Sequence, residues 1–288
     1  MSEGIAAPAL AAAATEIDIA QAATAQEVHA NRIVSVDYCA DQYVLQLAGR
    51  ARIAGLSPDA TRDFSYLRAQ AAGLPQVRPS AEEVLALRPD LVVRSYGGGV
   101  SLKRFLEQLD VPVLQIGYAG SLADIQQTIL TVAAGLQAED KGRALVRQME
   151  QRLAKIADMR NAQNLAAKSP TNTPRSALYM TPSGVTSGPG TLVDEMLRAA
   201  ALENFQQRPG WHALPLERLA YESPQLVAVA FFGALTNHLN AWSAFHHPIA
   251  RAQHQSPHML ALEGAWTSCG GWFLVDAIEA LHDAATQL

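Results

Sequence analysis

The residues of this chain that are best suited to binding a ligand are aromatic, and several of them follow segments typical of buried strands. Tyr38, Tyr96 and Tyr118 each come shortly after a run of β-branched or aliphatic residues. Ligands of open α/β sheets bind beyond the carboxyl ends of the strands. Aromatic faces contact large planar or macrocyclic molecules at low entropic cost. The candidate ligand-binding residues are therefore Tyr38, Cys39, Arg62, Tyr96 and Tyr118 in the first half of the chain and Tyr179, Trp211, Phe232, Trp266 and Cys269 in the second. We expect some of these rings to seal the edges of the core instead.

Two arginines and a glycine run suggest an anionic ligand. Arg62 and Arg94 could pair with a catecholate or a carboxylate, although a local salt bridge is the simpler interpretation of Arg94. The run from Gly97 to Gly99 could cradle an anion with backbone N–H groups, or it could be a flexible turn between strand and helix. It has neither the GxGxxG nor the GxxxxGK[ST] form, so the sequence does not predict a nucleotide site.

The histidines do not form a recognisable metal motif. His238, His246, His247, His254 and His258 lie close together in sequence, but their spacing fits no defined ligand pattern. A solvated helix and loop is the favoured interpretation, and no metal site or cofactor is predicted. No HExxH motif, Ser-His-Asp order or paired acid motif occurs either, so no catalytic residue is assigned.

The chain has only two cysteines, Cys39 and Cys269, and each lies between an expected strand and an expected helix. Three interpretations remain open: a disulfide, two separate buried thiols, or a soft-ligand site. An oxidising compartment favours pairing.

Composition narrows the class of protein. The 288 residues are 49% hydrophobic and 17% charged, with a net charge of −5, which is typical of a folded globular chain of one or two domains. No basic stripe points to nucleic acid, and no segment reaches the roughly 20 apolar residues of a membrane span. Residues 5–14 are alanine-rich like the end of a signal sequence, but Met1-Ser2-Glu3 lacks a basic region, so no export signal is evident.

Strand and helix patterns alternate in both halves of the chain, which favours parallel sheets built from βαβ units. The expected strands are 33–36, 52–56, 91–93, 112–116, 177–180 and 226–230, and the expected helices are 43–47, 80–87, 102–109, 191–199, 216–221, 241–251 and 272–281. Ser80 is the expected N-cap of its helix, with Glu83 at the capping-box position. Between 121 and 162 only helical spacing occurs, and 161–174 resembles a surface linker.

The predicted fold is α/β, with two Rossmann-like lobes joined by one long helix. The expected divisions are a disordered or processed tail at 1–30, a first lobe at 31–120, a helical region at 121–162 and a second lobe at 163–288. An internal repeat supports two related lobes: EEVLALRPDLV at 82–92 is echoed by ERLAYESPQLV at 217–227.

Four segments, in order, resemble the solute-binding proteins of ABC importers for cobalamin, ferric siderophores and haem (class III, with a helical backbone). They are RIVSVDYCADQYVLQLAG at 32–49, SAEEVLALRPDLVV at 80–93, VPVLQIGYAGSLADI at 111–125 and SGPGTLVDEMLRAAALENF at 187–205. With the rest of the α/β pattern, the resemblance runs from about residue 32 to 280.

The resemblance implies a ligand cleft between the lobes and a rigid interdomain helix that limits closure. It implies that Glu82 and Glu217 dock arginine pockets of a membrane permease, although an exposed Glu in a first helical turn can simply offset the helix dipole. It implies a periplasmic monomer that carries a ferric siderophore or corrinoid. A haem receptor, in which Tyr38 or Tyr96 could bind the iron, is an alternative within the family. The resemblance also implies that the two cysteines lie on different lobes, which argues against a bridge because bridged Cα atoms must lie within about 4.4–6.8 Å.

Two alternatives come from other classes. One is a two-lobed Rossmann-type enzyme such as a nucleotide-sugar glycosyltransferase, and the other is a receptor-like protein that senses or scaffolds without transport.

Overall fold

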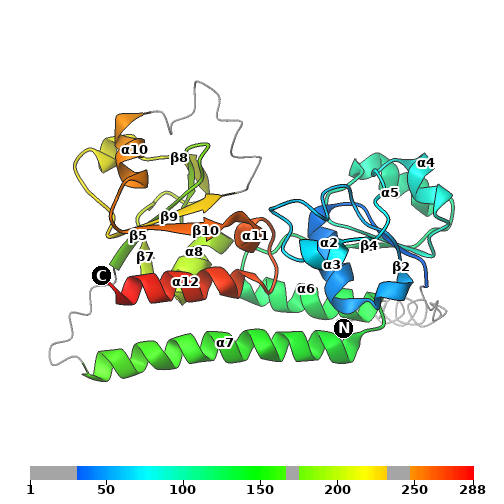
Figure 1. The fold of residues 1–288 in the computed structure, drawn as a ribbon, viewed down its shortest axis with the longest axis horizontal. Helices are drawn as coiled ribbons and strands as arrows, with labels where there is room; N and C mark the ends of the chain where they lie inside the picture. The colour runs from blue at the N-terminus through cyan, green and yellow to red at the C-terminus, as the bar shows by residue number, and fades with distance from the viewer. Residues whose placement is uncertain (1–30, 167–174, 232–246) are drawn as a thin grey trace, which may run out of the picture.

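Two four-stranded parallel sheets, one from each half of the chain, form the centres of two lobes in this computed structural model (Figure 1). The structure describes residues 31–166, 175–231 and 247–288. The first sheet has the order β2-β1-β3-β4, built from β1 (Ile33–Ser35), β2 (Ile53–Gly55), β3 (Leu91–Arg94) and β4 (Val113–Gln115). The second has the order β10-β9-β5-β7, built from β5 (Arg175–Met180), β7 (Leu202–Asn204), β9 (Leu226–Phe231) and β10 (Met259–Glu263). The predicted α/β class with two Rossmann-like lobes is confirmed.

Helices cover the first sheet, most of them close to where the sequence periodicity predicts, although the short helix at Arg68–Ala71 was missed. They are α2 (Tyr38–Leu47), α3 (Arg68–Ala71), α4 (Ala81–Ala86), α5 (Gly99–Gln108) and α6 (Leu122–Gly135), with a 3₁₀ turn at Arg50–Arg52. Ser80 caps α4 by accepting a hydrogen bond from the Glu83 backbone N–H. The Glu83 carboxylate binds Arg78 instead of closing the capping box.

The longest helix, α7 (Glu139–Ala166), runs beneath both lobes (Figure 1). At 1.5 Å per residue its 28 residues span about 42 Å. Lys141 near its start donates to the carbonyl of Leu47 in α2, and Arg152 farther along pairs with carboxylates of α12. The helix therefore holds both lobes. The expected linker at 161–174 is wrong over its first part, because α7 continues to Ala166.

The second lobe contains α8 (Leu192–Ala199), α9 (Leu216–Leu219), α10 (Pro248–His254), α11 (Gly264–Thr267) and α12 (Leu274–Thr286). Sequence patterns missed β7, β10 and the antiparallel pair β6 (Val185–Ser187) and β8 (Trp211–Ala213). Three of these strands have only three residues, too few to show an alternating pattern. The expected helix at 241–251 lies outside the described residues up to residue 246.

The two sheets have the same connectivity. In each sheet the first strand along the chain pairs with the second on one side and the third on the other, with the fourth next to the third; β6 and β8 stand apart. The repeated segments at 82–92 and 217–227 therefore occupy equivalent places, since α4 leads into β3 and α9 leads into β9. In the part of the chain that the structure describes, no helix is long and apolar enough to span a bilayer.

Candidate functional site

The strand order places a topological switch point between β1 and β3. From β1 the chain proceeds to β2 on one side and later returns to β3 on the other, so the loops after β1 and β3 diverge from neighbouring strand ends. Such crevices at the carboxyl edge of a parallel sheet are where open α/β proteins bind ligands. Tyr38 and Tyr96 follow these two strands, and their rings meet edge to face with centroids 5.8 Å apart.

Asp37 ties the two loops together. Its buried carboxylate caps α2 by accepting from the Ala40 backbone N–H, and it accepts from the Ser95 backbone N–H at 2.7 Å and hydroxyl at 2.6 Å. It also accepts from the backbone N–H groups of Tyr96 and Gly97. The weaker alternative, in which the glycine run cradles an anion, is not supported at Gly97, because a carboxylate of the protein itself accepts the hydrogen bond from the Gly97 N–H.

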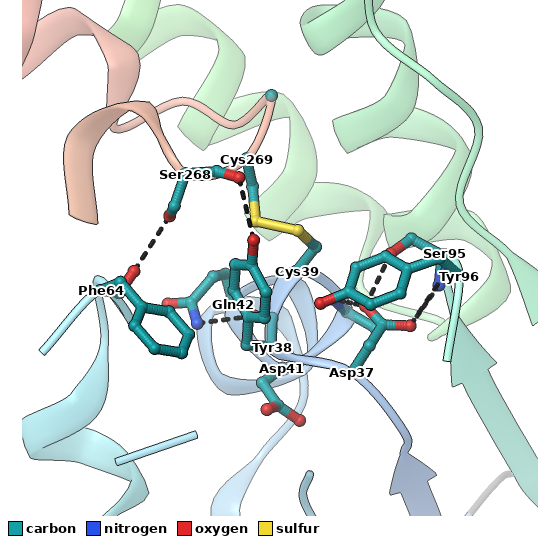
Figure 2. The surroundings of a disulfide bond; sticks show 12 residues. Asp37, Tyr38, Cys39, Asp41, Gln42, Phe64, Ser95, Tyr96, Ser268 and Cys269 are labelled. Atoms are coloured by element: carbon teal, nitrogen blue, oxygen red, sulfur yellow. Dashed lines mark hydrogen bonds between the residues drawn. A yellow bond between two sulfur atoms is a disulfide. The ribbon is translucent and has the colours of Figure 1, made fainter. Parts of the chain in front are cut away.

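The cysteines form a disulfide that joins the two lobes (Figure 2). Cys39 lies in the first turn of α2, and Cys269 lies between α11 and α12. Their Cα atoms are 5.7 Å apart, within the range that a bridge requires. The expectation that the lobes hold the cysteines too far apart is wrong, because both segments lie where the lobes touch. The pairing also excludes the soft-ligand interpretation.

Hydrogen bonds also cross between the lobes beside the Cys39–Cys269 disulfide, and this region of contact is called the junction below. The Tyr38 hydroxyl donates to the Ser268 carbonyl, the Ser268 hydroxyl donates to the Phe64 carbonyl, and the Tyr43 hydroxyl donates to the Gly270 carbonyl. The Phe64 ring packs against Tyr38 at 4.9 Å (Figure 2). Burial raises the pKa of the Tyr38 hydroxyl, so this group is a neutral donor at physiological pH.

Loops that follow all four strands of the first sheet gather near this junction. Cys39 follows β1, Phe64 lies in the loop after β2, and Tyr96 follows β3. After β4, Ala119 lies so close to Gly270 that a Cβ on that glycine would be 3.0 Å from the Ala119 Cβ. The carboxyl edge of the first sheet therefore faces the segment of the second lobe that follows β10 and α11.

The remaining candidates have different environments. Tyr118 is 82% exposed beside Ala119, and Trp211 is 53% exposed at the start of β8. Tyr179 is only 2% exposed and contacts Trp211 from inside the core, so its ring is structural. Trp266 is half-buried against the core.

Arg62 is not brought to the junction by any contact among the described residues. Arg62 is exposed and pairs with Asp59 at 3.8 Å. Phe232 lies outside the described residues. Arg94 is 5% exposed and, in the described part of the chain, forms no salt bridge, so the expected local ion pair is wrong.

Asp37, Phe64 and Ser268 were missed as site residues. An Asp directly between a strand and a helix is an N-cap signal, which could have identified Asp37. Nothing local marks Phe64 or Ser268, since each acquires its place only through the contact between lobes.

No metal centre is evident among the described residues, which hold no group of three or more His, Cys, Asp and Glu side chains arranged around a metal. His247 caps α10 by accepting from the Ile249 backbone N–H, and His254 packs against Phe231. His258 is exposed. His238 and His246 lie outside the described residues.

The chain was compared with protein families and with solved structures. A family model described as "Periplasmic binding protein" matches residues 33–232. Among solved structures, the apo periplasmic heme-binding protein RhuT from Roseiflexus sp. RS-1 aligns with a TM-score of 0.68 at 23% identity, covering 88% of this chain and 99% of its own. The periplasmic vitamin B12-binding protein BtuF of Vibrio cholerae aligns with a TM-score of 0.62 at 19% identity, covering 90% and 98%.

A third similar structure is CeuE of Helicobacter pylori with Ni(II) bound, with a TM-score of 0.63 and 15% identity over 91% of this chain and 85% of its own. These identities show a shared fold. No curated protein matches the chain.

We predict that breaking the Cys39–Cys269 bridge destabilises the protein by about 2–5 kcal/mol, because the bridge closes a loop of 230 residues in the unfolded chain. Denaturant unfolding of the wild type, with and without a dithiol reductant, measures the difference. The Cys39→Ser/Cys269→Ser variant should unfold at the midpoint of the reduced wild type and should not respond to reductant. Equal midpoints for oxidised and reduced wild type would contradict the prediction.

We also predict that Asp41 makes stability fall with rising pH. Burial raises its pKa from 3.8 to about 6, even though it accepts hydrogen bonds from the Ser57 N–H and hydroxyl. The folded protein therefore keeps a proton that the unfolded chain releases, and about 2–3 kcal/mol of stability is lost between pH about 4 and 6. Asp41→Asn should flatten this part of the curve of unfolding free energy against pH. Asp140→Asn, at an exposed carboxylate of α7, is the control; an unchanged slope in Asp41→Asn would refute the assignment.

Proposed function

Because the chain belongs to the periplasmic binding protein family, we propose that it captures a small metal chelate between its lobes and delivers it to the permease of an ABC importer. The chelate classes are a ferric siderophore, a corrinoid or haem. The observation that carries this proposal is the gathering of the first sheet's carboxyl-end loops against the second lobe, with aromatic rings among them.

Exposed rings near the junction suit such a ligand. Tyr96 is 54% exposed and Tyr118 is 82% exposed, both in loops at the carboxyl edge of the first sheet. Rings left open by the fold offer broad faces to a planar or macrocyclic chelate. The similar structures include proteins described as binding heme and vitamin B12, and one with Ni(II) bound.

The covalent connection between lobes favours a receptor that moves little. The disulfide and α7 both link the lobes, so we expect ligand binding to change their relative orientation only slightly. A disulfide also suits an extracytoplasmic location, where oxidising conditions preserve it.

Thermal unfolding of the purified protein with haem, cobalamin and a panel of ferric siderophores tests the proposal. A ligand at 100 times its dissociation constant should stabilise the protein by about 2.7 kcal/mol, which raises the melting temperature by about 5 °C or more for a chain of this size. A nucleotide sugar should give no shift. A shift with the nucleotide sugar and none with the chelates would favour the glycosyltransferase alternative and refute transport.

Glu82 and Glu217 are suited to docking the permease. Both are exposed in the first turns of the equivalent helices α4 and α9, and neither has an ion-pair partner among the described residues. The neighbouring Glu83, by contrast, is held by Arg78. Two free carboxylates, one on each lobe, match a two-fold transporter that presents two basic pockets.

We predict that Glu82→Ala/Glu217→Ala lowers ligand-stimulated ATPase activity of the reconstituted importer at least tenfold, while ligand affinity stays unchanged. The matched control is Glu107→Ala/Glu222→Ala, which removes one exposed carboxylate from each lobe where local Lys or Arg partners exist. Equal activities for the two double variants would show that the docking assignment is wrong.

A further inference from the structure

Arg94 is a buried cation whose guanidinium has no ion-pair or hydrogen-bond partner in the described part of the chain. It is 5% exposed, its Nε is fully buried without a hydrogen bond, and no carboxylate of the described residues lies within 4.0 Å of the guanidinium. The nearby Asp37 carboxylate is occupied by the α2 cap and by the loop after β3. A buried charge without a counterion costs free energy, so the fold keeps this side chain at the expense of stability.

The strand pattern shows where the side chain lies. Arg94 is the last residue of β3 and shares a face with Val92, because side chains alternate along a strand. Val92 packs with Leu102 and Leu106 of α5, whereas Leu91 and Val93 belong to the other face. Arg94 therefore lies on the α5 face, one step beyond Val92 toward the carboxyl edge of the sheet.

The glycine run that follows β3 packs closely against the segment after β1. Gly97 lies so close to β1 that a Cβ would come within 2.2 Å of the Val36 carbonyl oxygen. Gly98 and Gly99 have φ of +71° and +63°, which allows the chain to turn directly into α5. The first turn of α5 has no side-chain cap, so its free N–H groups and helix dipole add positive potential at the same edge.

The guanidinium tip is accessible although its stem is not. The two Nη atoms have no hydrogen-bond partner among the described residues, and unlike Nε they are not fully buried. Solvent therefore reaches the end of the side chain at the carboxyl edge of β3, next to the loop that carries Tyr96.

We propose that Arg94 is the anion-recognition residue of the ligand site and that the bound chelate carries an oxyanion, such as a carboxylate, phosphate or catecholate oxygen, which pairs with its Nη atoms. This rests on the proposed function, because it assigns a charge to the ligand of the same site. The planar guanidinium can donate two parallel hydrogen bonds to such a group. Arg62 is a poorer candidate, since it is exposed and already pairs with Asp59.

The effect of Arg94→Met on the melting temperature distinguishes a ligand-binding role of Arg94 from a structural one. If Arg94 is kept for a ligand, Arg94→Met removes an uncompensated charge and should leave the melting temperature of the ligand-free protein unchanged or higher. If Arg94 is a structural residue, the same change should lower it. Arg104→Met, at an exposed arginine of α5, is the control.

Binding is measured by quenching of tryptophan fluorescence with ligands paired by charge: haem against haem dimethyl ester, and an anionic ferric tricatecholate against a neutral ferric trihydroxamate. We expect the wild type and Arg104→Met to prefer the anionic member of a pair at least tenfold. Arg94→Met should lose that preference, and Arg94→Lys should keep part of it.

The outcomes separate this proposal from the proposed function. Binding without a charge preference, or a preference that survives in Arg94→Met, would overturn the role of Arg94 and leave chelate capture intact. Failure of Arg94→Met to fold, or a clear loss of its thermal stability, would also overturn it. If the wild type binds no chelate, the proposed function fails, and inorganic phosphate becomes the probe. A rise in melting temperature with phosphate that Arg94→Met lacks would support the anion site, and no rise would overturn it.

Discussion

The covalent link between Cys39 and Cys269 is the constraint on which the arrangement of the two lobes depends. It joins segments that are 230 residues apart, and it lies where hydrogen bonds from Tyr38 and Tyr43 also cross between the lobes. The long helix α7 supplies a second connection on another side (Figure 1). Because the two lobes are connected at two places, they have little freedom to separate, and we expect their relative orientation to be largely fixed before a ligand binds.

Two buried charged side chains at the carboxyl edge of the first sheet, Asp37 and Arg94, differ in whether the protein compensates their charge. Asp37 accepts hydrogen bonds from its own helix and from the loop after β3, so its charge organises the two loops around it. Arg94, the last residue of β3, has no such compensation from the residues that the structure describes. Within the described residues, one buried charge is fully satisfied and its neighbour has no counterion, which fits the proposed site for a negatively charged molecule.

The function proposed for the protein follows from the site more than from the fold alone. Related two-lobed α/β architectures serve enzymes as well as receptors. Here the proposal of capture and delivery rests on the aromatic rings at the carboxyl edge of the first sheet and on the pair of exposed carboxylates on equivalent helices.

The α/β class, most strands and the long helix could be predicted from the sequence, because buried strands, capped helices and the repeat at 82–92 and 217–227 are local patterns. Strands of three residues, such as β7, were missed because they are too short to show a period. The pairing of the cysteines and the isolation of Arg94 were decided only by tertiary structure. Local sequence places Cys39 after a strand and Cys269 before the last helix. The distance between the two lobes, and the absence of a counterion to Arg94 among the described residues, depend on how distant segments pack.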